Sequence, residues 1–64
     1  MTIKVPKEVL AGLEEIRESG LTNMLDYHQV MRLAFDMRHY VLVDWMNDNK
    51  KLYVKGIFEG FEAE

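Results

Sequence analysis

The C-terminal segment constrains the fold of this chain more than any other part of the sequence. Within it lie three large apolar residues and two glycines: Gly56, Ile57, Phe58, Gly60 and Phe61. The terminal segments of small domains are usually polar and frayed. A segment this apolar is expected to be docked, either on the rest of the chain or on another molecule.

The length of the chain predicts one domain spanning residues 1–64, near the lower limit for independent folding. A chain of this size buries only about 60% of the surface that its unfolded form exposes. Small domains often add disulfides, a metal or a second copy to gain stability. The sequence has no cysteine, which excludes disulfides and thiolate metal sites. Self-association or unusually good packing is therefore expected.

The composition indicates a globular protein without a general attraction to polyanions. Hydrophobic residues make up 48% of the chain and charged residues 30%, which is unlike intrinsic disorder. The net charge of −3 gives no overall pull toward nucleic acid or an anionic membrane. No run resembles a signal peptide or reaches membrane-spanning length. We expect a soluble, cytoplasmic protein.

Two helices are predicted from local signals, over residues 6–19 and 27–38. Pro6 suits the first position of a helix, and Gly20 can end that helix in a left-handed conformation. Residues 2–5 are rich in β-branched side chains and precede the proline, so they should form a short extended segment. The second helix starts with a capping box of Asp26 and Gln29. Its apolar face contains Tyr27, Val30, Met31, Ala34 and Met37.

Residues 40–61 allow two interpretations. Their β-branched and aromatic content, with a turn-like stretch at 47–49, is typical of a β-hairpin. The helical alternative places Leu42 and Met46 on one face of a third helix. Asn49 would then cap a fourth helix that carries Tyr53, Ile57 and Phe61 on one line. Local propensity leaves open a fold of two helices plus a C-terminal hairpin and an all-α fold.

Three motifs carry a resemblance to a known family: Thr22-Asn23-Met24-Leu25-Asp26, Asp44-Trp45-Met46 and Tyr53-x-x-Gly56-Ile57-Phe58-x-Gly60-Phe61-Glu62. Together they resemble very small, functionally unassigned proteins of phages and prophages of Gram-positive bacteria, over nearly the whole chain. The resemblance implies helices in the last third. It therefore favours an all-α compact bundle of three to four short helices. The family pattern has a glycine between the second and third apolar segments, where this chain has Arg38 and His39.

The resemblance also implies a biological context. Small phage accessory proteins commonly bind a host protein and redirect or block it, and some inhibit bacterial defence systems, including CRISPR effectors. The resemblance supplies no reaction, cofactor or catalytic residue. The leading expectation is therefore a phage-encoded interaction protein in the host cytoplasm, with an anti-CRISPR-like inhibitor as one form of it.

The sequence offers little material for catalysis or metal binding. Ser19 is the only serine and lies at a predicted helix end, so a nucleophilic triad is not expected. The two histidines, His28 and His39, are too few for a zinc site. Asp44 and Asp48 are four residues apart, as on a solvated helix face. We predict no enzyme activity, no cofactor and no metal.

The apolar content exceeds what a chain this short can easily bury, and this predicts an interface. Four methionines of the sequence interior and several aromatic residues contribute to the surplus. The interface residues that we expect are Trp45, Tyr53, Phe58 and Phe61. A homodimer joined through this C-terminal aromatic region, a host protein partner, or both would cover them.

A small nucleic-acid-binding transcriptional regulator is the alternative function. Its contacts to phosphate, or to an acidic partner, would come from Arg32, Arg38, Lys50, Lys51 and Lys55. A helix-turn-helix arrangement would place the second helix in the major groove. The acidic residues that flank Arg32 and Arg38 weaken this interpretation.

Overall fold

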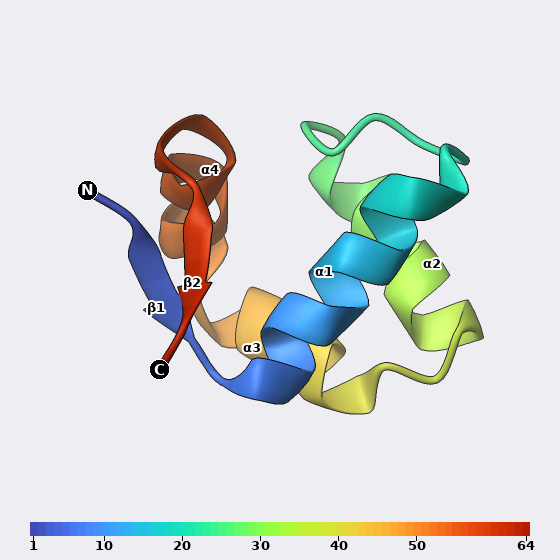
Figure 1. The fold of residues 1–64 in the computed structure, drawn as a ribbon. Helices are drawn as coiled ribbons and strands as arrows, with labels where there is room; N and C mark the ends of the chain where they lie inside the picture. The colour runs from blue at the N-terminus through green and yellow to red at the C-terminus, as the bar shows by residue number, and fades with distance from the viewer.

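Four short helices enclose the core, and a two-stranded parallel sheet joins the two ends of the chain (Figure 1). The computed structural model describes all residues 1–64. The elements in chain order are β1 (Ile3–Val5), α1 (Lys7–Ser19), α2 (Tyr27–Asp36), α3 (Tyr40–Asp48), α4 (Lys50–Glu59) and β2 (Phe61–Ala63). The expected bundle of short helices is confirmed, with the small sheet in addition. Residues 40–59 form two helices rather than a hairpin.

The local signals of the first two helices are used in part as the sequence predicts. Pro6 precedes α1 as its N-cap, with φ −56° and ψ 151°, and does not occupy the first helical position. Gly20 ends α1 with φ 66°, and its N–H donates to the carbonyl of Arg17.

The N–H of Gln29 donates to the carboxylate of Asp26 at 3.3 Å, which caps α2. Only one half of the predicted capping box forms, since the N–H of Asp26 donates to the carbonyl of Asn23. Helix α2 ends at Asp36, two residues earlier than predicted.

The turn after α2 explains this early end. Arg38 has φ 63° and is the only residue other than glycine with a positive φ. This left-handed conformation interrupts the helix, and α3 begins two residues later at Tyr40. The strained position is the region where the resembled family pattern has a glycine.

We expect Arg38→Gly to raise the free energy of unfolding by about 0.5–1 kcal/mol. The left-handed conformation costs an L-residue about 1–2 kcal/mol, and the greater entropy of glycine in the unfolded chain offsets part of the gain. Urea denaturation measures the difference. Arg32→Gly, inside α2, is the control and should instead lose about 1 kcal/mol. Equal effects at both positions would contradict the interpretation of the turn.

The core lies between α1, α2 and α3 and is closed by α4. Its buried members are Val5, Val9, Leu13, Ile16, Val30, Ala34, Leu42, Met46 and Tyr53. The predicted apolar faces of the first two helices are therefore confirmed, since α1 and α2 supply most of these residues. No buried side-chain nitrogen or oxygen lacks a hydrogen-bond partner.

The junction between α3 and α4 uses Asn49 differently from the prediction. Its side chain makes no capping bond to α4. The side-chain amide instead donates to the carbonyl of Trp45 at 3.0 Å. Asn49 therefore closes the end of α3, and the two helices meet with a single residue between them.

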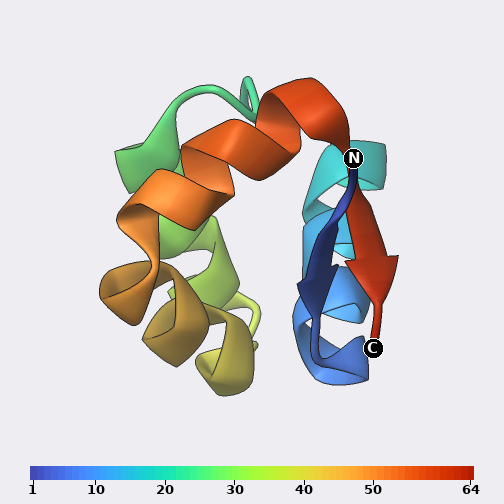
Figure 2. The same cartoon turned by 90° about the vertical axis from the view of Figure 1, so that its left-hand side faces the viewer.

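Strand β2 corrects the prediction for the end of the chain. Phe61 was expected on the last helix, but α4 ends at Glu59 and Gly60 follows with φ 95° and ψ 158°. That conformation is accessible essentially to glycine alone. It turns the chain back so that β2 runs parallel to β1, beside α1 (Figure 2). Ile3 pairs with Phe61 in this register.

Candidate protein-binding faces

The structure places the four predicted interface residues at different depths. Tyr53 is 1% exposed and belongs to the core. Trp45 and Phe61 are half-buried and pack against that core. Phe58 alone is fully on the surface, with 76% of its area exposed. Three of the four aromatic residues are thus used mainly within one chain.

Phe61 is packed against Gly56, which lies five residues before it on α4. A Cβ added to Gly56 would lie 2.8 Å from Cδ1 of Phe61, and closer still to two other ring atoms. The ring therefore occupies the space that a side chain at this position would fill. It also contacts Trp45 and Tyr53, with ring centroids 6.1 and 6.0 Å apart. This packing docks the apolar end of the chain, as its composition predicted.

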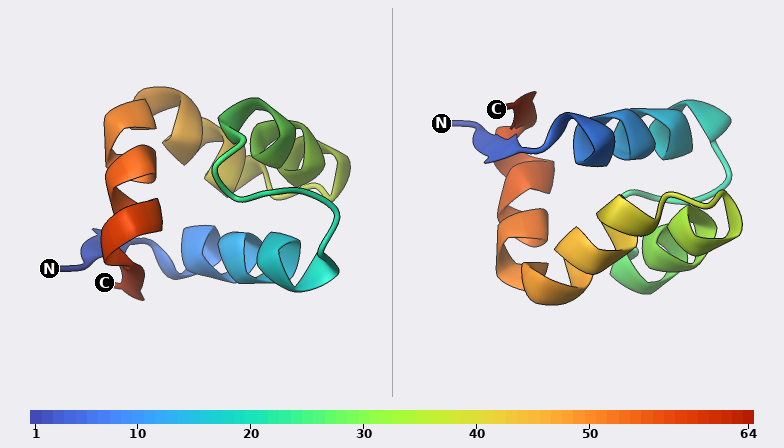
Figure 3. Two further views of the ribbon diagram at one scale, coloured as in Figure 1. Left: turned by 90° about the horizontal axis from the view of Figure 1, so that it is seen from above. Right: turned by 90° about the horizontal axis from the view of Figure 1, so that it is seen from below.

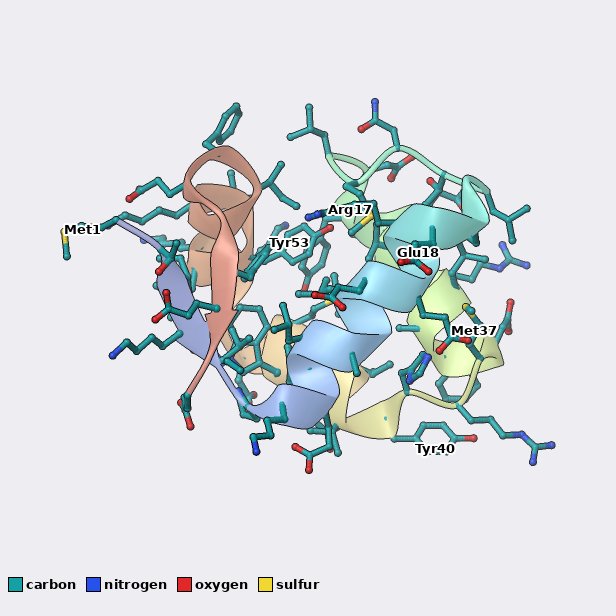
Figure 4. The ribbon with its side chains drawn as sticks, viewed as in Figure 1. Met1, Arg17, Glu18, Met37, Tyr40 and Tyr53 are labelled. Carbon is teal, nitrogen blue, oxygen red and sulfur yellow. The ribbon has the colours of Figure 1, made fainter.

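Two tyrosine hydroxyls anchor segments that are distant in sequence. Tyr53 projects from α4 into the interior, toward α1 (Figure 4), and its hydroxyl donates to the carbonyl of Met24 at 2.6 Å. Tyr27 donates to the carbonyl of Met46 at 2.7 Å. Desolvation raises the pKa of both tyrosines, that of Tyr53 to about 12. Nearby Arg17 acts in the opposite direction on Tyr53.

The first candidate binding face is the outward side of α4. We define the α4 outer face as Lys51, Val54, Lys55 and Phe58. These residues follow the i, i+3, i+4, i+7 spacing of one helix stripe, opposite the buried Tyr53 and Gly56. Its two apolar members are 44% and 76% exposed. Of its two cations, Lys51 forms no ion pair and Lys55 pairs with Glu59 at 3.9 Å.

The second candidate face lies where α2 and α3 meet. Phe35 and Tyr40 contact each other edge to face, with ring centroids 5.7 Å apart, yet they remain 59% and 52% exposed. Tyr40 projects from the surface at the start of α3 (Figure 4). Four exposed charged residues accompany the two rings. We define the α2–α3 corner as Phe35, Tyr40, Arg32, Asp36, Arg38 and Asp44.

Sequence reasoning did not identify this corner. Phe35 lies outside the apolar line that the sequence predicted for its helix. That position was the available signal, because an aromatic residue off the core-facing line of a helix must face solvent or a partner. The contact with Tyr40 depends on the turn at Arg38, which local patterns did not define.

The five basic residues of the alternative function do not form one patch. Lys51 and Lys55 lie together on α4, and the Nζ of Lys50 lies 5.2 Å from the ring centroid of Tyr27. Arg32 and Arg38 belong to the corner. Helix α4 and the end of α2 lie at opposite ends of the molecule in two perpendicular views (Figures 1 and 3).

The residues considered for catalysis and metal binding have local structural contacts. The Oγ of Ser19 donates to the carbonyl of Ile16 at 2.6 Å, at the end of α1. The Nε2 of His39 lies 2.8 Å from a carboxylate oxygen of Glu15, which joins α3 to α1. No group of three or more His, Asp or Glu side chains is arranged to hold a metal ion. No pocket was found in the surface.

Comparison with known proteins identifies the family of the chain. No match was found among curated proteins or among solved structures. None of the four helices combines the length and the apolar character needed to cross a membrane. The family model described as Domain of unknown function (DUF5049) matches residues 2–61. The chain therefore belongs to the DUF5049 family, whose function is unassigned.

Proposed function

We propose that this protein is a small, non-enzymatic interaction protein, encoded by a phage or prophage, that binds a host protein in the bacterial cytoplasm. The α4 outer face is the proposed contact. The exposure of Phe58 supports this proposal most directly. The chain folds Phe61 away on a glycine, three residues later, but leaves Phe58 in water. Nothing within the fold requires a phenylalanine at that place.

The chemistry of the α4 outer face indicates what kind of partner it fits. Aromatic residues that enter a partner's pocket often dominate protein interfaces, and charged residues at the rim set the choice of partner. Here Val54 and Phe58 supply the apolar anchor, and Lys51 and Lys55 flank it. The complementary surface is an apolar groove bordered by carboxylates. A bacterial defence component, such as a CRISPR effector, is the first host protein to test because some small phage accessory proteins inhibit such systems.

We expect Phe58→Asp to abolish capture of the host partner while leaving the fold intact. The substitution places a charge where an apolar anchor is needed, and the exposed position tolerates it in the free protein. The measurement is affinity capture from host lysate with quantitative mass spectrometry, comparing wild type with the variant. Phe35→Asp is the matched control, because Phe35 is also exposed, at 59%, and lies at the other end of the molecule. A host protein that binds both variants like wild type would argue against this face.

The nucleic-acid-binding alternative has a separate test. A short DNA duplex at low salt should bind if the basic residues act together, and the affinity should fall steeply with added salt. Reversal of Lys51 and Lys55 to glutamate would abolish such binding. The separation of the arginines from these lysines favours the protein partner. Fluorescence anisotropy without any signal at low salt would eliminate the regulator.

A further inference from the structure

The two candidate faces differ in the signs of their charges, and this difference decides what each can bind. The α4 outer face carries the cations Lys51 and Lys55, and the Glu59 that pairs with Lys55 leaves a net positive charge. The α2–α3 corner has two of each sign: Arg32, Arg38, Asp36 and Asp44. Two copies of a cationic face repel each other, whereas two copies of a face with both signs can attract. Charge therefore separates a face for a foreign partner from a face for a second copy.

The four charges of the corner are not paired within the chain. The three ion pairs of the structure join the N-terminus to Glu59, His39 to Glu15, and Lys55 to Glu59. Arg32 and Asp36 are one helical turn apart but form no ion pair with each other. The four charged residues lie within four sequence positions of the two exposed rings and form no ion pair within the chain.

We infer that the α2–α3 corner is the surface through which two copies of this chain associate. A two-fold interface brings the same patch of both subunits together, so each residue must find its complement on that patch. The exposed rings of Phe35 and Tyr40 would pack on those of the second copy. Arg32 and Arg38 of one copy would then face Asp36 and Asp44 of the other.

The strained turn supports this location independently. Arg38 holds a left-handed conformation that glycine adopts without strain, yet the chain carries an arginine there. Strained backbone of this kind often marks a functional position. Arg38 lies between Phe35 and Tyr40 in the sequence and is exposed, so its side chain could reach a carboxylate of a second copy, a role that glycine cannot fill.

The expected location differs from the one that the sequence suggested. Trp45, Tyr53 and Phe61, which were candidates for a dimer contact, pack on the core of their own chain. The corner consists of six residues. A standard interface buries roughly 800 Å² per partner and involves about 20–30 residues on each side, so this contact is small. The dimer should therefore be weak and visible only at high protein concentration.

The test exchanges charges and then mixes the variants. Arg32→Glu/Arg38→Glu makes the corner fully acidic and changes the net charge from −3 to −7, since each exchange removes two units. Asp36→Lys/Asp44→Lys makes it fully basic and changes the net charge from −3 to +1. Sedimentation equilibrium over a wide concentration range should show wild type associating, each variant monomeric, and an equimolar mixture of the two associating at least as strongly as wild type.

Two further variants separate a specific interface from general attraction and from misfolding. Glu14→Lys/Glu18→Lys on α1 also has a net charge of +1 but keeps the corner intact, so it should associate with itself like wild type, and adding the acidic variant should not increase that association. Arg38→Gly is expected to fold more stably and still associate several-fold more weakly. A wild-type chain that remains monomeric at millimolar concentration would overturn the inference. So would charge variants that associate like wild type. Neither result bears on the α4 outer face.

Discussion

Gly56→Ala is expected to lower the free energy of unfolding by about 2 kcal/mol, although alanine is the better helix former. The added methyl group would overlap the ring of Phe61, whose nearest atoms lie far inside normal contact distance. Overpacking of this kind typically costs about 1–3 kcal/mol. The ring must leave its place beside Trp45 and Tyr53, and β2 is displaced with it. Urea denaturation monitored by circular dichroism measures the loss.

The sign of this effect should reverse when Phe61 is removed. In a Phe61→Ala background the methyl group meets no ring, so Gly56→Ala should gain up to about 1 kcal/mol from helix propensity. The double-mutant cycle therefore has a coupling energy of about 3 kcal/mol between two residues five positions apart. A coupling energy near zero would show that Phe61 does not pack on Gly56.

Alkaline pH is expected to destabilise the protein through Tyr53. Burial raises the pKa of this hydroxyl from 10.0 to about 12 in the folded state. The folded chain then holds a proton that the unfolded chain releases, so the stabilisation is complete below pH 10 and is lost between pH 10 and 12. Two pKa units correspond to about 3 kcal/mol. Domains of this size rarely have more than about 3–5 kcal/mol to lose, so most molecules should be unfolded near pH 12.

Tyr53→Phe separates the pH effect from the packing of the ring. The variant leaves the carbonyl of Met24 without its donor, so it should be about 1–3 kcal/mol less stable than wild type at pH 7. Its stability should decline less between pH 10 and 12. Tyr27, whose pKa is also raised, accounts for the decline that remains. Tyr40→Phe removes an exposed hydroxyl and is the control. A parallel decline in the Tyr53 variant and in wild type would contradict the assignment.

The first two helices could be predicted because their signals are local. Asp26 and Gly20 act on backbone groups within four residues, and the apolar spacing defines one face of each helix. The sheet could not be predicted in this way. It pairs Ile3 with Phe61 through strands of three residues, and no local pattern specifies a partner so far along the chain. The end of α4 depends on the conformation of Gly60. The helical spacing of apolar residues continues to Phe61, so the sequence pattern gave no sign of this end.

The sequence also could not predict which apolar residues form the candidate faces. Composition indicated correctly that the chain has more large apolar residues than its core holds, but it could not sort them. Phe58 and Phe61 have the same side chain and lie three residues apart, yet one faces water and the other packs on Gly56. The difference arises from the turn between them. The burial of a side chain depends on the assembled fold, so it cannot be predicted from residue type alone.

The parallel pairing of β1 and β2 has a consequence for biosynthesis. Strand β1 is translated before the four helices, but its partner, residues 61–63, is translated after them. Until the ribosome has released those residues, the backbone of β1 lacks its ladder and Gly56 lacks the ring that covers it. Until residues 61–63 have been translated, the backbone of β1 is hydrogen-bonded to water and the apolar surface beside Gly56 stays exposed. The fold can therefore be completed only after β2 has been synthesised.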